Sequence, residues 1–93
     1  MSDDLNLNEP VSTRNLERLK TLLDEGVNID EVDDHGNTAL WRAVYDYKGD
    51  GTFVELLLAN GADPNHKNKA DKSSKELAYM IANYDVRKYF PEQ

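Results

Sequence analysis

Residues 22–43 read LLDEGVNIDEVDDHGNTALWRA, and residues 57–78 read LLANGADPNHKNKADKSSKELA. The two stretches align at an offset of 35 residues and share a leucine pair, the glycine that follows it and a closing alanine. Self-similarity at a fixed period is typical of an array of one supersecondary unit, whose core forms by stacking on its neighbours. The sequence therefore predicts a repeat architecture, and it favours a binding scaffold over an enzyme.

Each unit is predicted to contain two helices and a polar loop. Gly26 and Gly61 follow the apolar runs at 17–23 and 53–60, where a left-handed residue ends a helix and glycine adopts that conformation without a Cβ clash. Thr38 and Ser73 can accept hydrogen bonds from the first amides of helices expected over 39–47 and 74–82. The intervening stretches 27–37 and 62–72 are rich in Asn, Asp and Gly, so we expect exposed loops there.

The motifs GNTALWRAV (36–44) and VELLLANGADPNHKN (54–68) are similar to the ankyrin repeat, whose pattern is close to DxxGxTPLHxAA…VxxLLxxGAxxN. The matching positions of the middle unit are Asp33, Gly36, Thr38, Leu40, Ala43, Val54, Leu57, Leu58, Gly61, Ala62 and Asn65. The resemblance implies an all-α ankyrin repeat stack of about two and a half repeats.

The resemblance covers most of the 93 residues and implies a single domain. Its expected parts are an N-terminal tail at 1–12, a partial repeat at 13–33, a central full repeat at 34–67 and a C-terminal capping repeat at 68–93. The chain departs from the family pattern at Trp41, where the family has histidine, and at Asp71, where it has the loop glycine. In the last unit Lys75 replaces a leucine, as expected for a terminal repeat whose outer face has no neighbour.

The composition argues against several classes of function. Eighteen acidic residues against 11 basic ones give a formal net charge of -7, which disfavours nucleic-acid binding. The chain has no cysteine, and therefore no disulfide or thiol nucleophile. Residues 1–10 lack the basic start and apolar run of a signal peptide, and no stretch approaches the roughly 18 apolar residues of a membrane helix. We expect a cytoplasmic protein that has no membrane partner and is monomeric when free.

No constellation of residues predicts catalysis. His35 and His66 occupy different positions of the repeat, whereas a metal site needs three or four converging ligands. The stretch 46–57 approaches the spacing of a calcium loop but has Lys48 and Leu57 where carboxylates are needed, so we interpret it as a widened turn. We predict no catalytic, cofactor-binding or metal-binding residue, and no cofactor.

The resemblance implies that loop tips and first helices line a concave binding face. Carried over to this chain, the predicted partner-binding residues are Asp34, His35, Asn37, Trp41, Arg42, Tyr45, Asp46, Tyr47, Lys69 and Lys72. Aromatic and arginine side chains supply much of the energy of protein interfaces. Trp41 lies four residues before Tyr45 on an apolar stripe, so a core position is the alternative for Trp41, and Tyr45 and Tyr47 are open between core and contact.

Six acidic residues gather in and just before one loop: Asp24, Glu25, Asp30, Glu31, Asp33 and Asp34. They either attract a basic partner or form a solvated loop, and both interpretations stay open.

A narrower resemblance concerns the motifs GNTALWRAV, GADPN and IANYDV, with a glycine-containing turn between the first two. This combination is similar to short bacterial ankyrin proteins, some of which are immunity proteins for polymorphic toxins. The resemblance implies a non-enzymatic protein that binds and neutralises a cognate toxin, for which a basic domain is a suitable partner. An ankyrin adaptor for an endogenous partner and an orphan scaffold are the alternatives.

Overall fold

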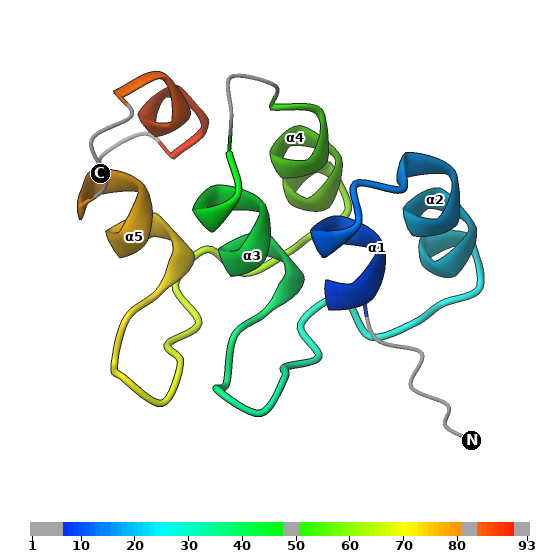
Figure 1. Ribbon diagram of the computed structural model, residues 1–93, viewed down its shortest axis with the longest axis horizontal. Coiled ribbons are helices and arrows are strands. Elements are labelled where there is room, and N and C mark those ends of the chain that lie inside the picture. Colours follow the sequence, from blue (N-terminus) through cyan, green and yellow to red (C-terminus); the bar gives the residue numbers. More distant parts are fainter. Residues whose placement is uncertain (1–6, 48–50, 81–83, 91–93) are drawn as a thin grey trace.

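The computed structural model describes residues 7–47, 51–80 and 84–90. Its elements, in chain order, are α1 (Asn8–Ser12), α2 (Leu16–Asp24), α3 (Ala39–Tyr45), α4 (Thr52–Ala59), α5 (Ser74–Met80) and the 3₁₀ helix η1 (Tyr84–Tyr89). Figure 1 shows α1, α3 and α5 in one layer, α2, α4 and η1 in a second, and the long loops projecting from the side of the first layer. The predicted all-α repeat stack is confirmed.

Local sequence explains where the helices begin and end. Gly26 and Gly61 have φ values of +84° and +91°, as predicted for residues that end α2 and α4. The Thr38 Oγ1 accepts a hydrogen bond from the Trp41 amide at 3.2 Å, and the Ser73 Oγ accepts one from the Glu76 amide at 3.1 Å. α3 ends at Tyr45, two residues before the predicted end. The predicted end of the next first-layer helix, at residue 82, lies outside the described residues.

α1 lies inside the segment that the sequence analysis assigned to an N-terminal tail. Leu7 and Val11 are 1% and 0% exposed, and α1 packs against α2 and α3. The Glu9 carboxylate accepts a hydrogen bond from the Arg18 Nε of α2 at 2.9 Å. A helix of five residues gives too short an apolar pattern to be recognised from periodicity. The first unit therefore has a helix pair of its own, while the exact division into units stays a prediction.

The core runs through the stack between the two layers. Leu19, Leu40, Leu57, Ala78 and Val86 are each 0% exposed. Their helices bury apolar faces on one another, which is the main source of stability for elements as short as these.

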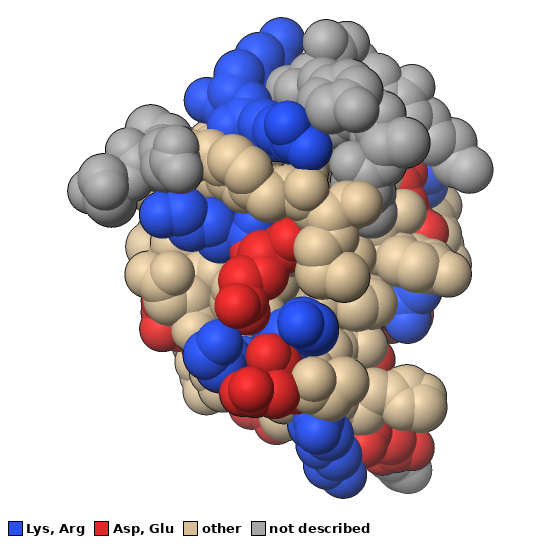
Figure 2. All heavy atoms as spheres, turned by 90° about the vertical axis from the view of Figure 1, so that its left-hand side faces the viewer, with Lys and Arg blue, Asp and Glu red and all other residues tan. Residues whose placement is uncertain are grey.

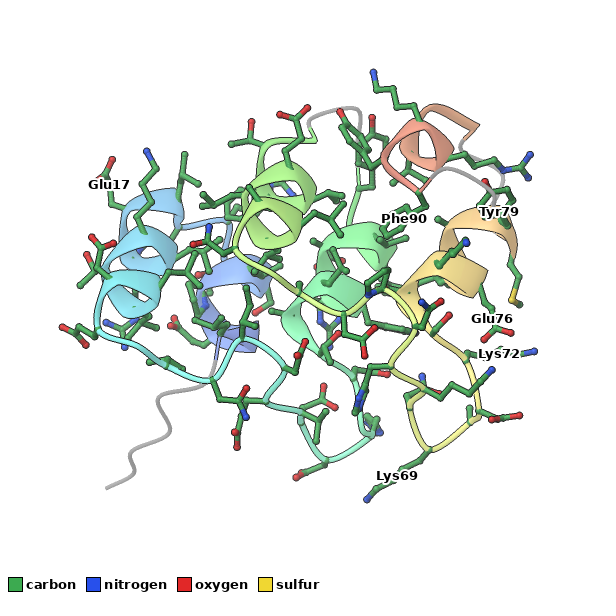
Figure 3. All side chains as sticks on the ribbon, turned by 180° about the vertical axis from the view of Figure 1, so that it is seen from behind. Glu17, Lys69, Lys72, Glu76, Tyr79 and Phe90 are labelled. Atoms are coloured by element: carbon green, nitrogen blue, oxygen red, sulfur yellow. The ribbon has the colours of Figure 1, made fainter. Side chains whose placement is uncertain are left out.

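The C-terminal end of the stack is closed by side-chain contacts. The Tyr79 hydroxyl donates to the Phe90 main-chain carbonyl at 2.7 Å, and Phe90 is buried. Figure 3 labels Tyr79 on α5 and Phe90 at the end of η1. Figure 2 shows charged side chains of both signs on the outer face of this end, which agrees with the polar cap expected of a terminal unit. Residues 48–50 of the predicted widened turn lie outside the described residues, and α4 already begins at Thr52.

Candidate partner-binding surface

Two loops of the same construction project from the stack. We call residues 25–38 the first finger and residues 60–73 the second finger. In the first finger the Asp33 Oδ1 accepts hydrogen bonds from the His35 and Asn37 amides at 2.9 and 3.0 Å. In the second, the Asn68 Oδ1 accepts from the Ala70 and Lys72 amides at 2.9 and 3.0 Å. Because one side chain closes each turn, the residues at each tip have a fixed position.

The two fingers are bonded to each other. The Lys69 amide donates to the His35 carbonyl at 3.0 Å, and the Asn68 Nδ2 donates to the Asn37 Oδ1 at 2.7 Å. Gly36 permits this approach, because a Cβ there would lie 2.9 Å from the Lys69 amide nitrogen. The tips therefore form one continuous edge, with Lys69 at the outermost point of the second finger (Figure 3).

A pocket of about 520 Å³ opens where the fingers meet α3. Its lining residues are His35, Asn37, Trp41, Asn68, Lys69 and Ala70. Asn68 is not among the predicted partner-binding residues, although the offset of 35 residues makes it the equivalent of Asp33 and so could have indicated a turn-closing role.

An aromatic cluster continues from this pocket along α3. The Trp41 and Tyr45 rings stack with centroids 5.3 Å apart and an interplanar angle of 13°. The Arg42 guanidinium lies 5.7 Å from the centroid of the Tyr45 ring. Tyr45 is 58% exposed, so this cluster presents an aromatic ring to solvent on a helix that its neighbours hold in place.

Arg42 also joins α3 to the first finger. Its Nη2 lies 3.9 Å from the Asp33 Oδ2, and both side chains are partly buried. The Arg42 Nε and the Trp41 Nε1 are buried without a hydrogen-bond partner. A buried donor without a partner costs about 1–3 kcal/mol, so its occurrence calls for an explanation. Two such donors on adjacent residues distinguish this part of α3 from the rest of the described core.

The ten predicted partner-binding residues do not share one environment. Exposed members are Asp34, His35, Tyr45, Lys69 and Lys72, and partly buried ones are Trp41, Arg42 and Asp46. Asn37 is only 5% exposed, unlike an open contact residue, and Tyr47 is 8% exposed, which agrees with the core alternative stated for it. The Asn37 side chain accepts the hydrogen bond from Asn68 that joins the two fingers. Tyr47 packs edge-on against Tyr89 in the core, with ring centroids 6.3 Å apart. A partner-binding role for all ten residues stays a prediction, and Asn37 lines the pocket despite its low exposure.

Among the described residues, the pKa of Glu76 departs most clearly from its ordinary value. Its carboxylate accepts a hydrogen bond from the Ser73 amide at 2.9 Å, and this bond is the main cause that holds the pKa of Glu76 below its ordinary value. The Lys67 ammonium, 3.1 Å from the same carboxylate oxygen, acts in the same direction. Together with the Ser73 hydroxyl, this carboxylate forms a capping box at the start of α5.

Two further observations concern the described part of the chain. Residues 7–47, 51–80 and 84–90 contain no group of three or more His, Cys, Asp or Glu side chains placed to hold a metal ion. None of the helices in those ranges has the length and apolar character needed to cross a membrane.

The stacked helix pairs and bonded fingers define a helical repeat protein that presents a loop-and-helix surface. The family model for ankyrin repeats, which describes three copies, matches residues 10–68. The chain therefore belongs to the ankyrin-repeat family. Ankyrin repeats indicate a protein–protein interaction module, and the family is generally non-enzymatic.

The chain spans only about a quarter or less of the length of the curated relatives described next. The chain is 35% identical over 101 residues to zygote-specific protein 3 of Chlamydomonas reinhardtii, covering 89% of this chain and 26% of the relative. It is 44% identical over 55 residues to the potassium channel AKT2/3 of Arabidopsis thaliana, covering 59% of this chain and 7% of the channel. It is also 35% identical over 71 residues to an intracellular phospholipase A2 of Caenorhabditis elegans, with 73% of this chain and 7% of that protein covered. None of these names refers to a toxin or to an immunity protein.

Proposed function

We propose that the chain binds a protein partner through the face formed by the two finger tips, the pocket between them and the exposed side of α3. The observation that carries this proposal is the Tyr45 ring, which is 58% exposed while Trp41 stacks against it and Arg42 lies beside it. Tyrosine, tryptophan and arginine are the residues most enriched in binding hot spots. A ring already held by its neighbours also loses little conformational freedom when a partner binds.

The fingers support the same face. Their tips are closed by Asp33 and Asn68 and joined through the bond between Lys69 and His35, so their backbones are organised before a partner arrives. Preorganisation lowers the entropic cost of association. The opposite layer offers a contrast, because α2 presents charged, exposed side chains such as Glu17 and Lys20.

The test of the face is a pair of double variants. A partner captured from the source lysate is purified, and its affinity is measured by titration calorimetry. We expect Tyr45→Ala with Asp46→Ala to weaken binding by more than ~1.4 kcal/mol, a tenfold change, with the melting temperature within a few degrees of wild type. The matched control, Glu17→Ala with Lys20→Ala on α2, should leave the affinity unchanged. Equal affinities for both variants would remove this face from consideration.

Toxin neutralisation is the most specific form of the proposal. It is supported by the resemblance of GNTALWRAV, GADPN and IANYDV to bacterial immunity proteins and by the net charge of -7, which suits a basic partner domain. An immunity protein should bind one partner in a one-to-one ratio over roughly 800 Å² per side and should abolish its toxicity.

Co-expression with the products of neighbouring genes distinguishes this role from the alternatives. Restored growth with the wild-type chain, and not with the Tyr45 and Asp46 double variant, is the result expected of an immunity protein. Tight capture of a partner without any protection would favour an adaptor, and the absence of any cognate partner would favour an orphan scaffold.

A further inference from the structure

The two neighbouring fingers carry different charges. The first finger contains five carboxylates and neither lysine nor arginine: Glu25, Asp30, Glu31, Asp33 and Asp34. The second contains three lysines and two aspartates: Lys67, Lys69, Lys72, Asp63 and Asp71. The formal charge therefore changes sign between two loops that are bonded to each other.

Only some of these charges are available to a partner. In the first finger Asp30 accepts a hydrogen bond from the Asp63 amide and Asp33 closes its own turn, whereas Asp34 is exposed at the tip. In the second finger Lys67 is paired with Glu76, as described above. The lysines left at this tip, Lys69 and Lys72, are exposed, and Figure 3 shows both extending away from the body of the molecule. Asp63 and Asp71 of the same finger are also exposed.

These charges flank the pocket in a fixed order. The bond from the Lys69 amide to the His35 carbonyl places the two tips side by side, and His35 and Lys69 both line the pocket. Trp41 and Ala70 contribute apolar walls. Along this edge the order is an acidic tip, a largely apolar opening and a tip with two exposed lysines, Lys69 and Lys72, and the exposed Asp71. Among the described residues no ion pair joins the two tips.

We propose that the partner of this face presents an extended segment of ampholytic character. Its basic side chain lies against Asp34, its apolar side chain enters the pocket beside Trp41, and its acidic side chain lies against Lys69 and Lys72. This inference rests on the proposed function and refines it. A uniformly basic segment, which the net charge alone would favour, places like charges against the second finger, and such pairings are unfavourable at interfaces.

The substitution Lys69→Glu should change the binding affinity in opposite directions for an ampholytic segment and for a uniformly basic one. If net negative charge attracted the partner, a more acidic second finger would strengthen binding. With an ordered pair of charges, the same change should weaken binding at least tenfold. Lys20→Glu on α2 changes the net charge by the same amount away from the fingers and is the matched control.

The probe is a random dodecapeptide library displayed on phage and selected on the immobilised wild-type chain. We expect enriched peptides to carry an apolar residue with a basic residue on one side and an acidic residue on the other. Synthetic copies should bind Lys69→Glu at least tenfold more weakly than wild type and should bind Lys20→Glu as they bind wild type. Their affinity should fall as the salt concentration rises, because exposed charges are screened.

Enrichment of purely basic peptides, failure to enrich any peptide, or tighter binding to Lys69→Glu would each overturn the proposed charge order. Binding of the selected peptides to the Tyr45 and Asp46 double variant tests the proposed face independently of the charge order. Peptides weakened by the double variant but unaffected by Lys69→Glu would leave the face in place and refute the charge order. Peptides weakened by Lys69→Glu but unaffected by the double variant would keep the charge order and restrict the face to the finger tips.

Discussion

Gly36 is the single residue on which the contact between the fingers most depends. Its φ of +79° is unfavourable for a residue with a side chain, and an added Cβ would also lie 2.9 Å from the Lys69 nitrogen and 3.2 Å from the Asn68 Cα. Gly61 has a similar φ of +91° but nothing within 4 Å of its Cβ position. The two glycines thus separate the cost of backbone strain from the cost of a clash.

We expect Gly61→Ala to lower the free energy of unfolding by about 1 kcal/mol, the cost of a left-handed alanine. Gly36→Ala should lower it by about 2–4 kcal/mol, because it adds overpacking against the second finger. Urea unfolding of both variants measures the difference. Equal losses would mean that the fingers separate at little cost, and the rigid edge assumed for partner binding would be wrong.

Asp33 and Asp34 offer a second comparison between adjacent residues. Asp33 accepts two backbone hydrogen bonds that close the first finger, while Asp34 is exposed. Asp33→Ala should destabilise the protein by about 1–2 kcal/mol, as the loss of a capping side chain does, and Asp34→Ala should stay within about 0.5 kcal/mol of wild type. Thermal unfolding of the pair checks this. A large loss for Asp34→Ala would show that the acidic tip is structural.

At the scale of a single element, the capping box of α5 gives a pH-dependent prediction. The pKa of Glu76 is held below its ordinary value by the Ser73 amide first and by Lys67 second. A carboxyl whose folded-state pKa is lowered stabilises the fold above its unfolded-state pKa, about 4.3 for glutamate, and loses that contribution as the pH falls through the folded-state pKa. The contribution of Glu76 is therefore present at neutral pH and disappears in acid.

Glu76→Gln tests this, since glutamine can still accept from the Ser73 amide but carries no charge. We expect its melting temperature to be lower than that of wild type at pH 7 and to approach it as the pH falls through the folded-state pKa of Glu76. Glu31→Gln, in an exposed loop, is the control and should differ little from wild type at either pH. If the melting temperature of Glu76→Gln stayed equally far below that of wild type in acid, the loss of stability would come from the changed side-chain geometry and not from the lost charge.

The elements also show what the sequence can predict. The ends of α2 and α4 and the starts of α3 and α5 were predictable, because Gly26, Gly61, Thr38 and Ser73 act on neighbouring backbone atoms. α1 was not, since five residues give little periodicity.

The candidate surface was predictable only in part. The exposure of Tyr45 and Lys69 agrees with the predicted face, but the burial of Asn37 depends on Asn68, a residue of the next unit. The acidic and basic loops are visible in the sequence. Their contact is not, because it depends on a backbone bond between Lys69 and His35.

For the whole molecule, Leu57 tests both the register of the stack and its cooperativity. This residue of α4 is 0% exposed in a core that continues from Leu7 to Phe90, within a body whose extents are 37 × 26 × 22 Å. Repeat stacks derive their stability from units and from the interfaces between them, so damage in a central unit weakens both interfaces at once. At roughly 0.05–0.15 kcal/mol per residue the whole chain has about 5–14 kcal/mol to lose.

We expect Leu57→Ala to lower the free energy of unfolding by about 2–5 kcal/mol, whereas truncation of the partly buried Leu58 should cost less. Unfolding followed by Trp41 fluorescence, which reports on α3, should coincide with unfolding followed by far-ultraviolet circular dichroism, which reports on all helices, in wild type and variant alike. A small effect of Leu57→Ala would contradict the repeat register. Transitions that coincide in wild type but separate in the variant would contradict the single cooperative transition expected for the variant. They would show instead that the central repeat couples the two ends of the stack.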